Sequence, residues 1–99
     1  MAHADEAALA RLLPVLRQLR EIKGMREMQP GTFYLKGNAF IHFHDAAGAL
    51  VADLRKAGAL AADLKRARGG FDRYAVDTPV GQRKLLDDAK RRVDRGDDE

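Results

Sequence analysis

Hydrophobic positions near the start of the chain recur at spacings of three and four residues. The positions that share this stripe are Leu9, Leu12, Leu13, Leu16, Leu19 and Ile22. Such spacing predicts an amphipathic helix over residues 5–23. Pro14 lies inside the stripe and removes a backbone hydrogen bond, so the helix should either kink there or break, with a second helix starting at Pro14. Residues 25–31 lack the pattern and are expected to form a connector that ends in a Pro-Gly turn.

The pattern then changes to alternation of apolar and polar residues, which is typical of β-strands. Alternating segments cover residues 32–36, 39–44 and 49–54, and they predict a three-stranded antiparallel meander. Gly37-Asn38 suits a two-residue type II′ hairpin, because the first central position of that turn requires a positive φ angle. Residues 45–48 suit a four-residue turn that ends in glycine.

Alternation assigns the strand residues to two faces of the sheet. The strongly apolar face, which is the predicted core face, carries Tyr34, Ala39, Ile41, Phe43, Leu50, Ala52 and Leu54. The opposite, mixed face carries Phe33, Leu35, Phe40, His42, His44, Val51, Asp53 and Arg55. A one-residue bulge near residues 36–38 would exchange the two faces of the first strand, so the assignment of that strand depends most on the register.

The second half of the chain predicts two more helices and one more strand. Residues 55–68 return to helical spacing and stop at Gly69-Gly70. Residues 71–77 alternate again and should form a fourth strand at an edge of the sheet. Thr78 and Pro79 suit the N-cap and the first residue of a last helix.

This order of elements predicts an α+β fold. We expect an antiparallel sheet of about four strands, a three-stranded meander plus an edge strand, with N-terminal, middle and C-terminal helices packed on one face. The length of 99 residues predicts one domain, with frayed ends at residues 1–4 and 94–99.

Composition narrows the classes of function and location. Hydrophobic residues make up 45% of the chain and charged residues 33%, as in ordinary globular proteins. The chain has no cysteine and no serine, so thiolate metal sites, disulfides and nucleophiles of both types are excluded. Asp5 and Glu6 precede the first apolar stretch, where an export signal would carry basic residues, so we expect a cytoplasmic protein. Because no apolar run approaches the roughly 18–20 residues that cross a bilayer, we expect no membrane partner.

The formal net charge of +3 does not by itself indicate a nucleic-acid-binding protein. Acidic and basic residues are interspersed along the predicted helices, which is typical of a solvated surface. Chains that bind nucleic acid cluster their basic residues on one face. Weak nucleic-acid binding is therefore only an alternative function.

The segment FIHFHD contains the residues best suited to chemistry. His42 and His44 share one face of a strand, with Cβ atoms roughly 7 Å apart. Asp53 on the neighbouring strand and Asp45 in the adjoining turn could each add a carboxylate. Because two imidazoles and one carboxylate form the ligand set of non-haem iron sites, we take His42, His44 and Asp53 as a candidate site for a divalent metal ion. The alternative is that the histidines occupy a half-exposed strand and that Asp45 serves the turn.

The mixed face also contains an apolar group that would form a patch if nothing covered it. Its members are Phe33, Leu35, Phe40 and Val51. Exposed patches of this kind usually mark interaction sites, so the group is a candidate interaction face and a candidate homodimer contact. In the alternative arrangement, the first helix covers these residues and no patch exists.

The segments LLPVL, PGTFYLKGNAFIHFHDAAGALVADL and FDRYAVDTPVGQRKLL together support a resemblance. The chain resembles, from about Leu12 onward, a family of small, functionally uncharacterised bacterial α+β domains, some of which are labelled luciferase-type domain proteins. The shared pattern includes the leucine-proline helix, the His-x-His strand and the terminal strand and helix, and the Ala-rich residues 57–68 depart from it. The resemblance implies an α+β fold and points to His42 and His44 as the site, and it implies no activity.

From these observations we expect a non-enzymatic module that binds a ligand or another protein. The first alternative is a small metal-binding or histidine-dependent enzyme centred on His42 and His44. The second alternative is the weak nucleic-acid binder described above.

Overall fold

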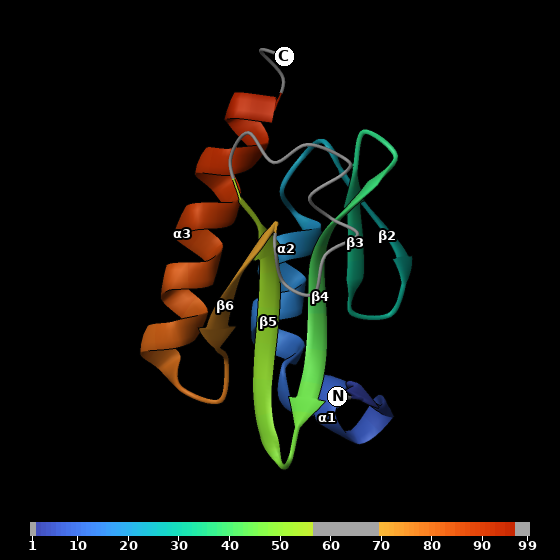
Figure 1. Cartoon of the computed structure of the whole chain (residues 1–99), viewed down its shortest axis with the longest axis vertical. Coiled ribbons are helices and arrows are strands. Elements are labelled where there is room, and N and C mark those ends of the chain that lie inside the picture. The colour runs from blue at the N-terminus through green and yellow to red at the C-terminus, as the bar shows by residue number, and fades with distance from the viewer. Residues whose placement is uncertain (1, 57–69, 97–99) are drawn as a thin grey trace.

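The computed structural model describes residues 2–56 and 70–96 (Figure 1). Its elements, in chain order, are β1 (Ala2–His3), α1 (Glu6–Arg11), α2 (Leu13–Arg20), β2 (Met25–Gln29), β3 (Thr32–Leu35), β4 (Asn38–Ala46), β5 (Ala49–Arg55), β6 (Phe71–Ala75) and α3 (Pro79–Gly96). The predicted middle helix at residues 55–68 begins inside β5 and, from residue 57, lies outside the described residues. None of the helices in the described ranges is long and apolar enough to cross a membrane.

The strands form one antiparallel sheet, and the predicted α+β class is confirmed. Their order is β2-β3-β4-β5-β6, and β1 pairs with β4 beyond the start of β3. Both β1 and β2 are additional to the four predicted strands, and β1 occupies the place of the frayed end expected at residues 1–4. In Figure 1, α2 lies behind β4 and β5, and α3 runs beside β6.

The first predicted helix breaks into two helices near Pro14, which was one of the two predicted outcomes. The α1 helix ends at Arg11 and α2 begins at Leu13, with Pro14 in its first turn. Proline is accepted there because the first amides of a helix have no partner inside it. At the start of α1, the Asp5 carboxylate accepts a hydrogen bond of 2.9 Å from the Ala8 amide. This N-cap allows a helix of only six residues to begin.

The expectation of a connector over residues 25–31 is wrong for its first part, which forms β2. The sequence of this strand, MREMQ, has no strong alternation, and among the described strands it pairs only with β3. An edge strand of this kind depends on its neighbour for its conformation. Met28 remains 56% exposed, so β2 gains little from burial of its side chains.

Both hairpin turns of the meander differ from the predicted ones. Leu35 pairs with Asn38, so the first loop is Lys36-Gly37, whose φ angles are 53° and 83°. The second loop is Ala47-Gly48, with φ angles of 53° and 90°. Two consecutive positive φ angles define a type I′ turn, in which glycine takes the second central position and the left-handed first position is accepted by lysine or alanine.

A bulge opposite β3 overturns the predicted faces of that strand. The β3–β4 register shifts between Phe33 and Tyr34, because Phe33 pairs with Ile41 whereas Tyr34 pairs with Ala39. Phe40 is therefore the extra residue of β4. As a result, Phe33 shares the core face with Ile41, and Tyr34 turns to the outer face.

From Ile41 onward in β4, and along β5, the predicted faces are confirmed, although the predicted register is wrong by two residues. His42 pairs with Asp53 and His44 pairs with Val51, whereas the four-residue turn would have paired His42 with Val51. A shift of two residues keeps every side chain on its face because side chains alternate along a strand. The outer face therefore carries His42, His44, Val51 and Asp53, as expected.

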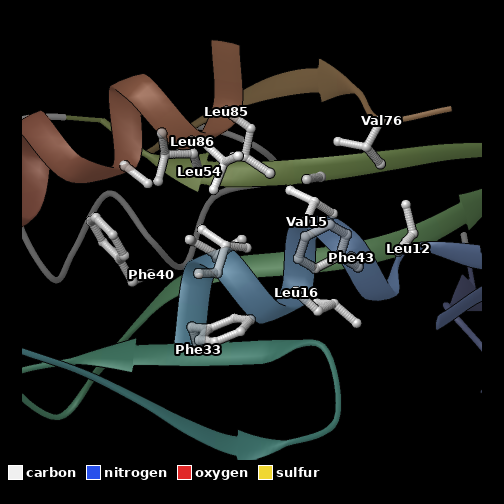
Figure 2. Close-up of a cluster of buried hydrophobic side chains, with 14 of the residues drawn as sticks. Leu12, Val15, Leu16, Phe33, Phe40, Phe43, Leu54, Val76, Leu85 and Leu86 are labelled. Carbon is white, nitrogen blue, oxygen red and sulfur yellow. The ribbon is translucent and has the colours of Figure 1, made fainter. Parts of the chain in front are cut away.

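The core lies between the inner face of the sheet and the helices (Figure 2). Three phenylalanines, Phe33, Phe40 and Phe43, are among its largest fully buried side chains. The helices contribute the buried residues Leu12, Val15, Leu16, Leu19, Leu85, Leu86, Ala89 and Val93. Leu12, Leu16 and Leu19 belong to the predicted stripe, whereas the buried Val15 does not and the predicted Leu13 stays 37% exposed. Both α2 and α3 nevertheless bury an apolar stripe in the core.

The start of α3 packs tightly against the end of β6. The Gly81 amide donates a 3.1 Å hydrogen bond to the Thr78 hydroxyl, which confirms the predicted N-cap. A Cβ atom at Gly81 would overlap the carbonyl oxygen of Ala75. Glycine at this position therefore permits the helix to approach the strand end closely.

Candidate functional site

The structure brings the predicted metal ligands together on the outer face of the sheet. His42 lies directly opposite Asp53 in the register of β4 and β5. The His44 Nε2 atom lies 3.3 Å from the Asp53 Oδ2 atom. We call His42, His44, Asp53 and their neighbour Arg73 the histidine face.

Arg73 on β6 is the member of this cluster that the sequence did not reveal. It pairs with Asp53 in the register, and its guanidinium donates two hydrogen bonds to the carboxylate, of 2.9 Å from Nε and 3.1 Å from Nη2. These bonds raise the pKa of Arg73. The Asp53 side chain is only 9% exposed, so its charge is matched inside a largely buried ion pair. The alternation of residues in β6 does not by itself place Arg73 beside Asp53, because that requires the register between β5 and β6.

The two imidazoles pack against each other and against β6. Their ring centroids lie 5.7 Å apart in an edge-to-face arrangement, and the His42 ring lies 5.5 Å from the ring of Phe71. Burial lowers the pKa of His42, and the nearby His44 lowers it further. Burial also lowers the pKa of His44, although Asp53 opposes this effect. Both rings are therefore mainly neutral near pH 7.

The carboxylates that the predicted metal site requires have other partners in the structure. Within residues 2–56 and 70–96, no group of three or more His, Asp or Glu side chains is placed to hold a metal ion. The physical reason lies in the partners of the carboxylates. The Asp53 carboxylate is occupied by Arg73, and Asp45 accepts a 2.7 Å hydrogen bond from the Gly48 amide in the turn.

His44 offers little access for chemistry on a substrate. Its Nε2 atom faces Asp53, and its Nδ1 atom is buried without a hydrogen-bond partner. His3 lies opposite His44 in the register of β1 and β4, but its Nε2 atom lies 3.1 Å from the carbonyl oxygen of Pro30. The third histidine of the chain is therefore directed toward the β2–β3 turn.

The predicted interaction face is not a surface of the folded protein. Phe33, Leu35 and Phe40 are each 1% exposed, and only Val51 lies half-buried on the outer face. The bulge at Phe40 is the reason for the β3 residues, because it turns Phe33 and Leu35 to the core face, and Phe40 itself belongs to the buried core cluster. The expectation of an exposed patch formed by these four residues is therefore wrong, and a homodimer contact based on them loses its support.

A different concave site lies at the N-terminal helices. A groove of about 780 Å³ lies between the two N-terminal helices and the β2–β3 turn. Its apolar wall consists of Leu9 and Ala10 from α1 together with Leu13 and Leu16 from α2. Leu13 is 37% exposed, which is unusual for a leucine in this chain because most of the others described are buried. We call this site the helix groove.

Hydrogen bonds connect the two walls of the helix groove. The Arg20 guanidinium at the end of α2 donates bonds of 2.6 Å and 3.1 Å to the Glu27 carboxylate on β2. Glu27 also accepts a 3.0 Å hydrogen bond from the Gly31 amide, and these two interactions lower the pKa of its carboxyl group. A Cβ atom at Gly31 would lie 2.7 Å from the Leu9 side chain, so the turn is in direct contact with the helix wall.

The sequence contained one signal of the helix groove. Leu9 and Leu13 extend the apolar stripe of the first helical segment beyond what a single straight helix buries, and Pro14 marks the bend between α1 and α2. The wall formed by the β2–β3 turn could not be predicted from the sequence, because β2 and this turn do not follow an apolar pattern.

Comparisons of the chain with protein-family models, with curated proteins and with solved structures found no match.

Proposed function

We propose that this protein is a non-enzymatic binding module that holds a small, mainly apolar molecule in the helix groove. The observation that supports the proposal is the size and lining of this groove. Its volume of about 780 Å³ falls within the range of roughly 300–1,000 Å³ that is common for small-molecule sites. Its wall is apolar, with a few polar groups near it, and binding sites of this type usually have that composition.

The bond network around Glu27 supports a groove that exists before the ligand arrives. Arg20 and the Gly31 amide both bind Glu27, so the end of α2 and the β2–β3 turn are tied together. A site with fixed walls loses less conformational entropy on binding than a site that must assemble.

The histidine face supports a structural role better than a catalytic one. A general base needs a ring nitrogen within hydrogen-bond reach of the substrate. The two nitrogens of His44 are directed at Asp53 and into the protein, respectively. Asp53 in turn connects β4, β5 and β6 through His44 and Arg73. The proposal therefore assigns binding to the helix groove and sheet stability to the histidine face.

Titration with N-phenyl-1-naphthylamine, a neutral fluorescent molecule, tests the proposal. The wild-type protein should give a saturable rise in fluorescence, and Leu13→Asn should weaken binding about tenfold, because contact with a leucine side chain is worth about 1.5 kcal/mol or more. Val80→Asn is the matched control, since Val80 is an apolar residue with 68% exposure in the first turn of α3. Equal affinities of the wild type and Leu13→Asn, or fluorescence that never saturates, would overturn the proposal.

A further inference from the structure

We infer that the helix groove selects a cationic amphiphile, a molecule with an apolar body and an ammonium head group. This inference rests on the proposed function and adds the chemical class of the ligand. It follows from the charges that line the groove and from the partners that each of them has.

The one guanidinium among the described lining residues is already neutralised. Arg20 is the only lysine or arginine among the described residues that line the groove, and its guanidinium forms two hydrogen bonds with Glu27. The Nε–Oε1 distance of 2.6 Å is that of a strong, charge-assisted bond. An anionic head group would have to compete with Glu27 for this guanidinium and would also meet the charge of the Glu27 carboxylate.

The negative charges in the lining are not neutralised in the same way. Asp5 and Glu6, at the start of α1, both line the groove and are exposed. Among the described residues, neither carboxylate takes part in an ion pair. Asp5 accepts one hydrogen bond from the Ala8 amide, which leaves its charge in place. Among the lining side chains, the carboxylates of Asp5 and Glu6 therefore have no cationic partner, whereas the Arg20 guanidinium has Glu27, and this balance favours a cationic ligand on a chain whose formal net charge is +3.

The apolar wall lies next to these carboxylates. Leu9 and Ala10 follow Glu6 on α1 by one turn of helix, and Leu13 and Leu16 continue the wall along α2. The eight residues of α2 span about 12 Å along the helix axis. An extended decyl chain has a comparable length, so a molecule of this size contacts the wall while its head group lies near Asp5 and Glu6.

Three decyl compounds that differ only in the head group test the inference: decyltrimethylammonium, decanol and decanoate. Each is used below the concentration at which it forms micelles, and its affinity is measured by displacement of N-phenyl-1-naphthylamine at low salt. Decyltrimethylammonium should bind most tightly. Its advantage over decanol should be about two- to fivefold, the size of one or two exposed charge interactions, and it should shrink as salt is added.

Glu6→Gln separates the charge effect from an effect on folding. This variant should lower the affinity for decyltrimethylammonium and leave the affinity for decanol unchanged. Glu21→Gln is the matched control, because Glu21 is an exposed residue that lines a different surface depression, and it should change neither affinity. Tightest binding of decanoate, or an equal effect of Glu6→Gln on all three compounds, overturns the inference and leaves the proposed function intact. If none of the three displaces the probe and the probe itself does not saturate, the proposed function fails as well.

Discussion

Asp53 is the one charged side chain that is buried among the described residues, and it stands at the centre of the histidine face. We expect Asp53→Asn to lower the free energy of unfolding by about 1.5–3 kcal/mol, because the Arg73 guanidinium would lose a charged hydrogen-bond partner in a largely buried setting. Urea denaturation measures this change.

Asp72→Asn is the matched control for this prediction. Asp72 also binds an arginine, Arg92, at 2.9 Å, but its side chain is 41% exposed. An exposed pair of this kind is worth less than about 1 kcal/mol. Equal losses in the two variants would contradict the view that burial makes the Asp53 pair important.

The two histidines predict a dependence of stability on pH. Their pKa values are lower in the folded protein than the ordinary value of 6.5. The unfolded chain therefore takes up protons first, and the folded state should lose stability as the pH falls below about 6.5 toward the lower pKa values of the folded rings. Below those values the loss from these groups is complete.

Urea denaturation between pH 8 and pH 5 checks this expectation. In the double variant His42→Gln/His44→Gln, the free energy of unfolding should depend less on pH over this range. If its pH dependence equals that of the wild type, the two histidines are not the source of the effect. Glu27 acts in a separate range, since its pKa is lowered from 4.5 and its contribution is lost only at more acidic pH.

Single residues also explain why the sequence located the histidine site but not its chemistry. Alternation placed His42, His44 and Asp53 on one face, and an error of two residues in the register did not change this result. The role of the Asp53 carboxylate depends on Arg73, which lies 20 positions further along the chain. Residue spacing can predict which side chains share a face and could bind a metal ion. It does not predict which other side chains bind them, because those come from strand pairing across the whole sheet.

At the scale of elements, the contact between α3 and β6 gives the sharpest test of packing. Alanine normally favours a helix by about 1 kcal/mol over glycine. We nevertheless expect Gly81→Ala to destabilise the protein by about 1–3 kcal/mol or more, because its Cβ atom would overlap the Ala75 carbonyl oxygen, and the backbone must move to relieve this contact.

Lys84→Ala in the same helix provides the comparison. Lys84 is exposed, so its replacement should change the free energy of unfolding by less than about 0.5 kcal/mol. Thermal and urea unfolding of both variants give the answer. A Gly81→Ala protein that is more stable than the wild type would show that the approach of α3 to β6 is looser than described.

The elements that could be predicted are those with a strong local signal. Pro14 marked the break between α1 and α2, Thr78 marked the start of α3, and alternation found β3 to β6. The strand β2 was missed because its conformation comes from pairing with β3 and not from its own polar sequence. The faces of β3 were wrong because one extra residue, Phe40, reverses them, and a bulge leaves no mark in the hydrophobic pattern.

At the scale of the whole molecule, the helix groove is a product of tertiary packing. Its walls come from β1, the two N-terminal helices and the β2–β3 turn, which approach one another only in the folded chain. The spacing of apolar residues in the sequence indicated only the helical wall of this site. Burial of Phe33 and Phe40 in the core removes the predicted interaction face. The helix groove, which was not predicted, is the concave site that the fold forms instead.

Ligand binding at this scale should appear as a gain in overall stability. A ligand that binds only the folded protein stabilises it by an amount that grows with the logarithm of its concentration, about 2.7 kcal/mol at 100 times the Kd. Thermal unfolding with increasing decyltrimethylammonium should therefore show a steadily rising Tm for the wild type and a smaller rise for Glu6→Gln. A Tm that does not depend on ligand concentration would contradict binding to the folded state.

The two-residue strand β1 has a kinetic consequence. Its residue His3 and the following Ala4 line the helix groove, and the Ala4 amide donates a 3.1 Å hydrogen bond to the carbonyl oxygen of Phe43. So short a strand should detach by local opening at a free-energy cost far below that of global unfolding. We therefore expect the Ala4 amide to exchange its hydrogen with solvent much faster than the amides at the centre of β4. A bound ligand should slow that exchange, because the release of β1 opens the groove at its side.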